Sequence, residues 1–289
     1  MKSRKILCPV DFSPASMHAL HMAIEIAKDS QCELVIAHAW HLPALYYSEL
    51  AFSSDVDQQI VETAEAELAG ALRGARATGI DKVSTLLLHG IPADKIIQTL
   101  EADPDYDLVV IGANGRSGLA RVLMGSVAEK IVRRAPCSVM AVHPTHPIRP
   151  FKNILCPIDF SESSFEAFEL ARRIARTDAG SVTLLHVLDM PLNYSGDPGT
   201  SQLLSDLDKR SSAHLDSLIA SDTSTKVTKL TRIGSPGRQI LALLESEPPF
   251  DLVVVGTHGR TGIKRLVLGS IAEKIVRYAP CPVIVARKR

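Results

Sequence analysis

Short apolar runs alternate along the chain with longer segments of helical periodicity. In the first 143 residues the apolar runs are KILCPV (5–10), ELVIAHAW (33–40), KVSTLLLH (82–89), DLVVIGA (107–113) and CSVMAV (137–142). Each run is apolar at nearly every position, as in strands of a parallel sheet that is covered on both faces. The pattern therefore predicts five buried parallel strands.

Helices are predicted between these runs, at 14–28, 55–78, 92–102 and 126–134. In the first of them, apolar residues recur three or four positions apart and share one face. Ser13 is a normal N-cap, and Pro14 is a normal first helical residue. Strands that alternate with helices predict an open α/β domain with right-handed crossover connections.

The second half of the chain repeats the first. KILCPVDFS (5–13) returns as NILCPIDFS (153–161), 148 positions later, and DLVVIGANGRSG (107–118) returns as DLVVVGTHGRTG (251–262), 144 positions later. A repeat of this length is a domain, because solenoid repeats have periods of 20–50 residues. We therefore predict two tandem domains, 1–143 and 152–289. A proline-rich linker, 144–151, joins them, and its prolines disfavour a helix.

Composition and charge exclude several classes of protein. Lys plus Arg and Asp plus Glu both total 32, so the formal net charge is 0, unlike that of a general nucleic-acid binder. Apolar residues make up 46% and charged residues 22%, which is typical of a globular protein. No apolar run is long enough to span a membrane, and no signal peptide is recognisable. A cytoplasmic protein with no nucleic-acid or membrane partner is expected.

The cysteines and histidines do not form a recognised metal motif. Five cysteines stand singly, without a CxxC pair, and are expected to be buried. His18 and His21 lie three residues apart but have no cysteine or carboxylate at a metal-binding spacing. No metal site is predicted.

Glycines follow the fourth predicted strand of each half at identical spacing. They are Gly112, Gly115, Gly118 and Gly125 before Ser126, and Gly256, Gly259, Gly262 and Gly269 before Ser270. In open α/β sheets, ligands bind outside the carboxyl ends of the strands. Glycine there lets main-chain N–H groups approach an anion, and a helix N-terminus suits a phosphate. The alternative is that these are turn and cap glycines only. GxGxxG and a Walker A loop are absent.

The two segments GANGRSGLARVLMGS and GTHGRTGIKRLVLGS resemble the G-x2-G-x9-G-[S/T] signature of the universal stress protein family. PVDFS and PIDFS are similar to the opening motif of that family, so the resemblance covers nearly the whole chain as two copies. It implies a five-stranded, Rossmann-like sandwich like that of the adenine nucleotide α-hydrolases. It also implies binding of ATP, or of ADP or AMP, with magnesium.

The signature and the resemblance together predict two nucleotide sites. The candidates for the first are Asp11, Ala39, Gly112, Ala113, Gly115, Arg116, Gly118, Gly125 and Ser126. The candidates for the second are Asp159, Val187, Gly256, Thr257, Gly259, Arg260, Gly262, Gly269 and Ser270.

These candidates have different expected roles. The resemblance places the two aspartates near the adenosine, although a carboxylate at that place also stabilises a helix N-terminus. It places the adenine beside Ala39 and Val187. Each arginine either clamps a terminal phosphate or lies in water. Ala113 and Thr257 differ between the halves, so the two sites are not expected to have equal affinity.

Three functions stay open at this point. The first is a nucleotide-dependent regulator of a stress response, and the second is an enzyme that hydrolyses ATP slowly. No residue that would orient water for hydrolysis is recognised, so no catalytic residue is assigned. The third is an interaction scaffold without a nucleotide. The resemblance also implies that the fifth strands, 137–142 and 281–286, pair within the chain as a pseudo-dimer, and a homodimer stays open as well.

Overall fold

A computed structural model describes the greater part of the chain, and it divides this chain into two compact units. Unit one extends to Ile148, and unit two comprises Arg149–Lys288. The described residues are 4–41, 54–113, 124–143, 148, 150–189, 198–220, 223–245, 249–259 and 268–288. Most of the predicted linker, at 144–147 and 149, lies outside the described residues.

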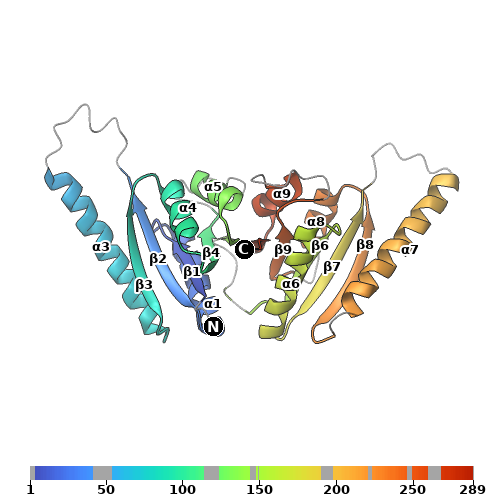
Figure 1. Ribbon diagram of the computed structural model, residues 1–289, viewed down its shortest axis with the longest axis horizontal. Coiled ribbons are helices and arrows are strands. Elements are labelled where there is room, and N and C mark those ends of the chain that lie inside the picture. Colours follow the sequence, from blue (N-terminus) through green and yellow to red (C-terminus); the bar gives the residue numbers. More distant parts are fainter. Residues whose placement is uncertain are drawn as a thin grey trace, which may run out of the picture. The chain divides into compact units, whose positions relative to one another are not determined.

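Unit one alternates strands and helices as its sequence pattern predicts (Figure 1). Its elements are β1 (Lys5–Pro9), α1 (Pro14–Ser30), β2 (Glu33–Trp40), α3 (Ser54–Ala77), β3 (Val83–His89), α4 (Pro92–Ala102), β4 (Tyr106–Gly112), α5 (Ser126–Arg134) and β5 (Ser138–Val142). The strands are parallel and lie in the order β3-β2-β1-β4-β5. The chain therefore reverses direction across the sheet between β1 and β4.

Unit two has the same architecture. Its elements are β6 (Asn153–Ile158), α6 (Glu162–Thr177), β7 (Ser181–Leu188), α7 (Pro198–Ala220), β8 (Lys226–Ile233), α8 (Pro236–Leu244), β9 (Leu252–Gly256), α9 (Ser270–Tyr278) and β10 (Val283–Ala286). Its strands are also parallel, in the order β8-β7-β6-β9-β10. The expected fold class, two tandem open five-stranded parallel sheets, is confirmed.

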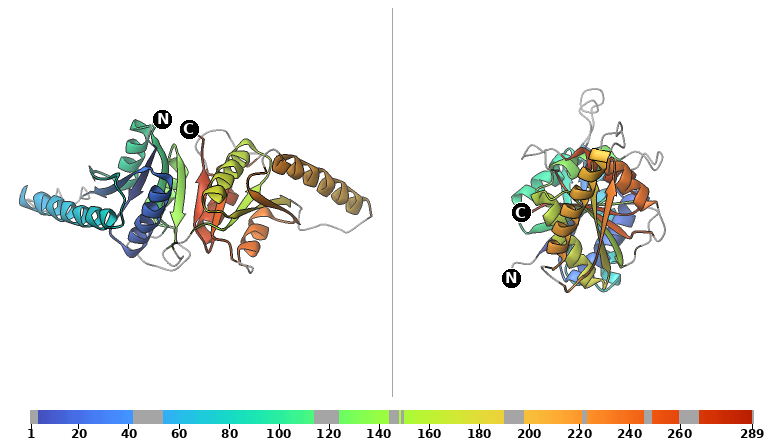
Figure 2. Two further views of the ribbon diagram at one scale, coloured as in Figure 1. Left: turned by 90° about the horizontal axis from the view of Figure 1, so that it is seen from below. Right: turned by 90° about the vertical axis from the view of Figure 1, so that its right-hand side faces the viewer.

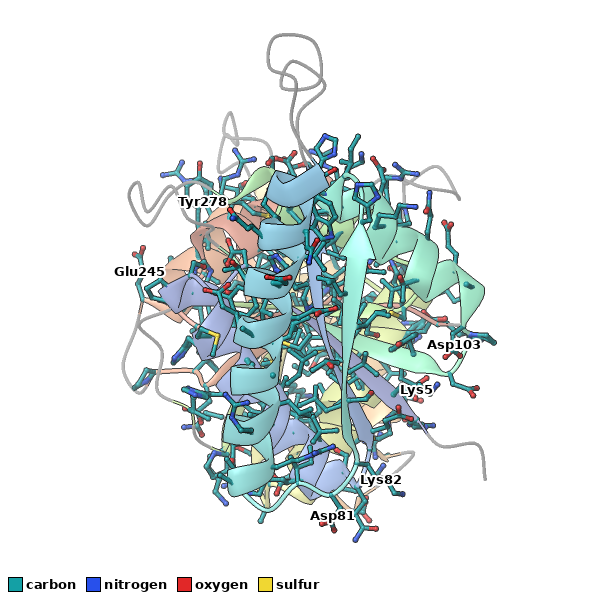
Figure 3. The ribbon with its side chains drawn as sticks, turned by 90° about the vertical axis from the view of Figure 1, so that its left-hand side faces the viewer. Lys5, Asp81, Lys82, Asp103, Glu245 and Tyr278 are labelled. Carbon is teal, nitrogen blue, oxygen red and sulfur yellow. The ribbon has the colours of Figure 1, made fainter. Side chains whose placement is uncertain are left out.

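Helices cover both faces of each sheet (Figure 2). Figure 3 looks toward β3 of unit one, with α3 on one side of this strand and α4 on the other. Right-handed crossovers place helices on opposite faces when the chain moves in opposite directions across the sheet. The carboxyl edge of the sheet is left open between these layers.

The core lies on the central strands, and the outermost strands β3 and β8 are only partly buried. Leu7, Cys8, Val109 and Val110 have no exposed surface. By contrast, most residues of β3 are half-buried or exposed, as are all residues of β8. The prediction that every strand is covered on both faces is therefore wrong for these two. Polar residues such as Ser84 on β3 and Lys229 on β8 favour this partial exposure.

Helix α1 begins where the sequence predicts. The Ser13 hydroxyl accepts a hydrogen bond from the Ser16 amide at 3.3 Å, and Pro14 is the first helical residue. Leu20, Ile24 and Ala27 are buried against the sheet. A serine N-cap satisfies one of the N–H groups that a helix start leaves without a partner. Throughout the described ranges, no helix is both long and apolar enough to cross a bilayer.

Candidate functional site

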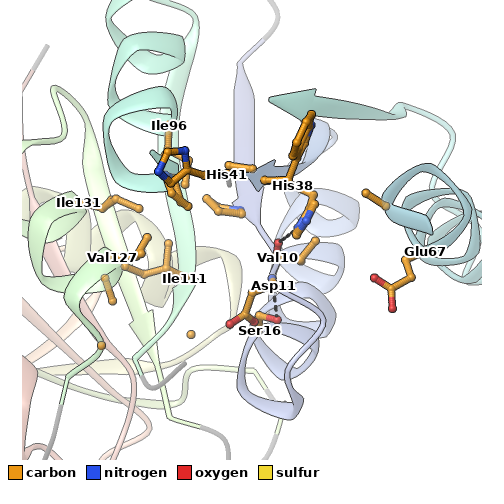
Figure 4. Close-up of a pocket in the computed structure, with 18 of the residues that line it drawn as sticks. Val10, Asp11, Ser16, His38, His41, Glu67, Ile96, Ile111, Val127 and Ile131 are labelled. Atoms are coloured by element: carbon orange, nitrogen blue, oxygen red, sulfur yellow. Dashed lines mark hydrogen bonds between the residues drawn. The ribbon is translucent and has the colours of Figure 1, made fainter. Parts of the chain in front are cut away.

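The carboxyl ends of β1, β2 and β4 surround a cavity of about 930 Å³ in unit one. Figure 4 shows the walls of this cavity, with Asp11 at the end of β1, His38 on β2 and Ile131 on α5. The first turn of α5, from Gly125 to Ala128, and one side of α3 complete the lining. The cavity thus lies where the strand order reverses, the usual ligand position in an open α/β sheet.

Asp11 is held in a tight turn between β1 and α1. Its Oδ1 atom accepts hydrogen bonds from the Ser13 amide at 3.0 Å and the Ser13 hydroxyl at 2.6 Å. Asp159 does the same in unit two, where the Ser161 amide and hydroxyl donate at 3.0 and 2.5 Å. One carboxylate oxygen therefore organises the helix start in both units. The expected structural role of these aspartates is present, and their role toward a ligand stays a prediction.

The residue after each aspartate has a left-handed backbone. Phe12 has φ of 62° and Phe160 has φ of 64°. This conformation costs a residue with a Cβ roughly 1–2 kcal/mol. Such outliers often lie at functional sites, where the surrounding structure imposes them. Because the same outlier occurs in both units at the same point, it belongs to the turn that presents the aspartate.

A histidine on the second strand secures each of these turns. The His38 Nδ1 atom donates to the Val10 carbonyl at 2.8 Å, and the His38 ring lies 4.8 Å from the Phe12 ring. His186 makes the same bond to the Ile158 carbonyl at 2.8 Å, and its ring lies 4.6 Å from Phe160. Since a carbonyl only accepts, Nδ1 carries a proton in both rings.

Sequence reasoning did not assign a role to these two histidines. Both stand at the same place on the second strand of each half, 148 positions apart, in IAHAW and LLHVL. The sequence shows this recurrence, but a histidine among apolar strand residues does not indicate its hydrogen-bond partner. The partner is a carbonyl 28 residues earlier that comes into reach only when the two strands pair.

Packing of the neighbouring helix explains why Gly112 and Gly256 are glycines. A Cβ atom on Gly112 would lie 2.9 Å from the carbonyl carbon and oxygen of Ala15, at the start of α1. On Gly256 it would lie 2.7 Å from the same atoms of Ser163 in α6. The helix after the first strand therefore approaches the end of the fourth strand closely. This close approach explains one glycine of each signature without an anion.

The two ends of each glycine signature are joined by a hydrogen bond. The Gly125 amide donates to the Ala113 carbonyl at 2.9 Å, and the Gly269 amide donates to the Thr257 carbonyl at 2.7 Å. These bonds bring the residue that follows β4 or β9 next to the residue that precedes α5 or α9. Within the described residues, neither Gly125 nor Gly269 provides a side-chain cap for that helix. The first N–H groups of both helices therefore receive no side-chain hydrogen bond from these two N-cap residues.

In unit two, the first signature residues approach Asp159 directly. A Cβ atom on Gly259 would lie 2.8 Å from the Asp159 Oδ2 atom. The His258 carbonyl accepts a hydrogen bond from the Ser163 hydroxyl at 2.5 Å, and the Ser161 oxygen lies 3.2 Å from the same carbonyl. The aspartate turn and the glycine loop are thus in contact, as a shared binding site requires.

The structure brings some of the predicted site residues together and leaves others undescribed. In unit one, the candidates that line the cavity are Asp11, Ala39, Gly112, Gly125 and Ser126. In unit two, Val187 lies on β7, and Thr257 and Gly259 follow β9. Gly115, Arg116, Gly118, Arg260 and Gly262 lie outside the described residues. A phosphate-clamping role for either arginine therefore stays a prediction.

Titratable groups near the first strands have structural roles. Burial raises the pKa of the Cys8 and Cys156 thiols, which lie on β1 and β6 without exposed surface. This burial disfavours the thiolate that a redox site needs. A hydrogen bond to Asp103 raises the pKa of Lys5, at the other end of β1 from the cavity (Figure 3). Four of the five cysteines are buried as predicted, and Cys32 is partly exposed.

The fold and this cavity define the class of the protein, a duplicated open α/β sheet protein with its candidate ligand site at the strand switch point. The sequence model of the universal stress protein family matches residues 2–143 and again 150–287. The chain therefore belongs to the universal stress protein family, as a tandem member.

Individual relatives agree with this assignment. Universal stress protein Rv2005c of Mycobacterium tuberculosis is 28% identical over 265 residues, which cover 85% of this chain and 82% of the relative. Universal stress protein Mb2019 of Mycobacterium bovis is 31% identical over 240 residues, covering 79% and 72% of the two chains. A solved universal stress protein from Archaeoglobus fulgidus has the same fold, with a TM-score of 0.73 and 24% identity over the whole of both chains.

Proposed function

We propose that the protein binds an adenine nucleotide, ATP with magnesium, at the carboxyl edge of each sheet and acts as a nucleotide-dependent regulator of a stress response. The observation that carries the proposal is the juxtaposition of Asp11 with the first turn of α5 in one cavity. A helix start of this kind favours phosphate, and a carboxylate suits the hydroxyl groups of a ribose.

The residues of the cavity fit a nucleotide. Gly125 and Ser126 would hold phosphate through main-chain N–H groups and a hydroxyl, and Asp11 would accept hydrogen bonds from the ribose. Apolar side chains of Val10, Ile96 and Ile111 also line the cavity, as is usual in a small-molecule site. Its volume of about 930 Å³ is at the upper end of the usual range for small-molecule sites. Magnesium would be bound mainly through the phosphates, as it usually is in nucleotide sites.

Thermal unfolding with and without ATP and magnesium tests the proposal. A ligand that binds only the folded state at 100 times its Kd stabilises that state by about 2.7 kcal/mol. For a domain of this size the corresponding rise in Tm is about 6–10 °C. An Asp11→Ala, Asp159→Ala double variant should lose most of this rise, whereas Asp29→Ala, at the far end of α1, should keep it.

Mass spectrometry of small molecules released from the purified, denatured protein identifies the nucleotide directly. Recovery of ATP supports a binding protein that holds its ligand intact, and recovery of ADP alone would indicate hydrolysis. An unchanged Tm at millimolar ATP with magnesium, together with a preparation that releases no nucleotide, would refute the proposal.

A further inference from the structure

Helix α3 lines unit one's cavity with both apolar and polar residues. Ile60 and Ala64 are apolar, whereas Gln59, Thr63 and Glu67, four residues apart along this helix, are polar. The Thr63 hydroxyl donates its proton to the Gln59 carbonyl at 2.8 Å. Toward the cavity, the Thr63 oxygen is therefore left as an acceptor, and the Glu67 carboxylate is an acceptor as well. This part of the wall, which we call the α3 acceptor wall, consists of Thr63 and Glu67 and suits a ligand group that donates hydrogen bonds.

The equivalent positions in unit two have different chemistry. The buried leucines Leu68 of α3 and Leu215 of α7 align the two helices with an offset of 147. With this offset the counterpart of Thr63 is Arg210, and the counterpart of Glu67 is His214. The His214 ring stacks on the Phe160 ring, with 4.7 Å between the centroids. The hydroxyl and the carboxylate of the acceptor wall are thus replaced by a guanidinium and an imidazole.

The acceptor wall lies across the cavity from the start of α5. Figure 4 shows Glu67 on one side of Val10 and Asp11, with Val127 and Ile131 of α5 on the other. With the phosphates at the start of α5 and the ribose at Asp11, the base of a bound nucleotide would extend toward α3. Besides His38 and His41, the ionisable residues among the described lining are Asp11 and Glu67, and this lining contains no lysine or arginine. The two carboxylates favour a ligand group that donates hydrogen bonds.

We propose that the α3 acceptor wall of unit one recognises the exocyclic amine of the nucleobase and that unit two lacks this recognition. The inference rests on the proposed nucleotide function and adds the residues that select the base. A carboxylate accepts a charge-assisted hydrogen bond from an amine, and a base without the amine leaves the carboxylate without this partner. Glu67 is accessible to solvent, so the preference is expected to be about tenfold rather than larger.

The chain provides its own reporter for unit one. Its single tryptophan, Trp40, lines the cavity at the end of β2, so a ligand that enters this site changes the surroundings of the indole. The full-length protein is titrated with ATP and with purine riboside 5′-triphosphate, which differs from ATP only in lacking the 6-amino group. Tryptophan fluorescence then gives the affinity of unit one for each nucleotide. Isothermal titration calorimetry of the Asp159→Ala protein, in which only unit one is expected to bind, gives the same ratio without the reporter.

The wild-type protein should bind ATP about tenfold more tightly than the purine analogue at unit one. A Thr63→Val, Glu67→Leu double variant should bring this ratio close to one. The matched control is Glu65→Leu, which removes a carboxylate from the same helix at a position that does not line the cavity, and it should leave the ratio unchanged.

The outcomes separate this inference from the proposed function. One outcome is that the wild-type protein binds ATP and shows the same ratio of affinities for ATP and the purine analogue as the double variant. In that case the acceptor wall does not recognise the amine, but the proposed nucleotide function is unaffected. If neither method detects binding of either nucleotide, the proposed function fails and the inference fails with it. Circular dichroism of each variant checks that the helices are intact.

Discussion

Asp107 and Asp251 occupy the same place in the repeat but have different surroundings. The Asp251 side chain is buried, and its Oδ2 atom accepts hydrogen bonds from the Lys152 and Asn153 amides, both at 3.0 Å. Asp107 instead forms an exposed ion pair with Arg4 at 3.0 Å. The same residue type in equivalent positions therefore contributes differently to stability.

Replacement of these two aspartates by alanine should have very different effects. Asp251→Ala leaves two main-chain donors without their partner and should lower the free energy of unfolding by about 3 kcal/mol. Asp107→Ala removes an exposed ion pair and should cost less than about 1 kcal/mol. Urea unfolding followed by circular dichroism measures both. Equal losses would contradict this account, and Asp251→Asn, which retains an acceptor oxygen, should lie between them.

At the scale of single residues, the sequence revealed less about the site than about the fold. Ser13 and Pro14 identify the start of α1 because a cap and a first turn are local. The left-handed backbone of Phe12 and the bond from His38 to the Val10 carbonyl were not predicted. Both depend on β1 and β2 lying side by side, so no short-range pattern encodes them.

Among the elements, the close packing of α1 on the end of β4 is the most sensitive contact of the site. Gly112→Ala would place a methyl group 2.9 Å from main-chain atoms of Ala15, which cannot move without shifting the helix. Overpacking of this kind typically costs about 1–3 kcal/mol. The same shift would displace the turn that holds Asp11, so nucleotide affinity should fall together with stability.

Gly74→Ala is the matched control for this substitution. Gly74 lies inside α3, and a Cβ atom there would meet nothing within 4 Å. Alanine in an exposed helix interior should stabilise the protein by about 0.5–1 kcal/mol, because glycine loses more backbone entropy on folding. Thermal unfolding of both variants checks the pair. A Gly112→Ala protein as stable as wild type would show that α1 and β4 can separate at no cost.

The positions of the elements could be predicted closely, whereas their exposure could not. The observed α4 and α5 begin and end where the periodicity predicts, at Pro92–Ala102 and Ser126–Arg134. Exposure depends on strand order, and the sequence alone does not reveal that β3 and β8 lie outermost. The residues of α3 that line the cavity were also missed. The polar residues of α3 that face the cavity have the same spacing along the sequence as polar residues that face solvent. Only the folded structure shows which of them lie opposite the start of α5.

For the molecule as a whole, the duplication predicts two binding sites that can be separated by mutation. Each unit has its own aspartate turn, its own histidine bond and its own uncapped helix start. Both copies have these parts in the same geometry, so we expect two nucleotides per chain. The differences at the α3 acceptor wall and at Ala113 and Thr257 should make the two affinities unequal.

Single substitutions test this expectation, because Trp40 reports on unit one alone. Isothermal titration calorimetry of the wild-type chain should give a stoichiometry near two. Asp11→Ala should lower it toward one and abolish the fluorescence response, since the aspartate turn of unit one is lost. Asp159→Ala should lower it equally but leave the Trp40 response intact. A wild-type stoichiometry of one would mean that only one of the two units binds a nucleotide. A Trp40 response that survives Asp11→Ala would mean that the aspartate turn supports the fold of unit one but does not bind the nucleotide.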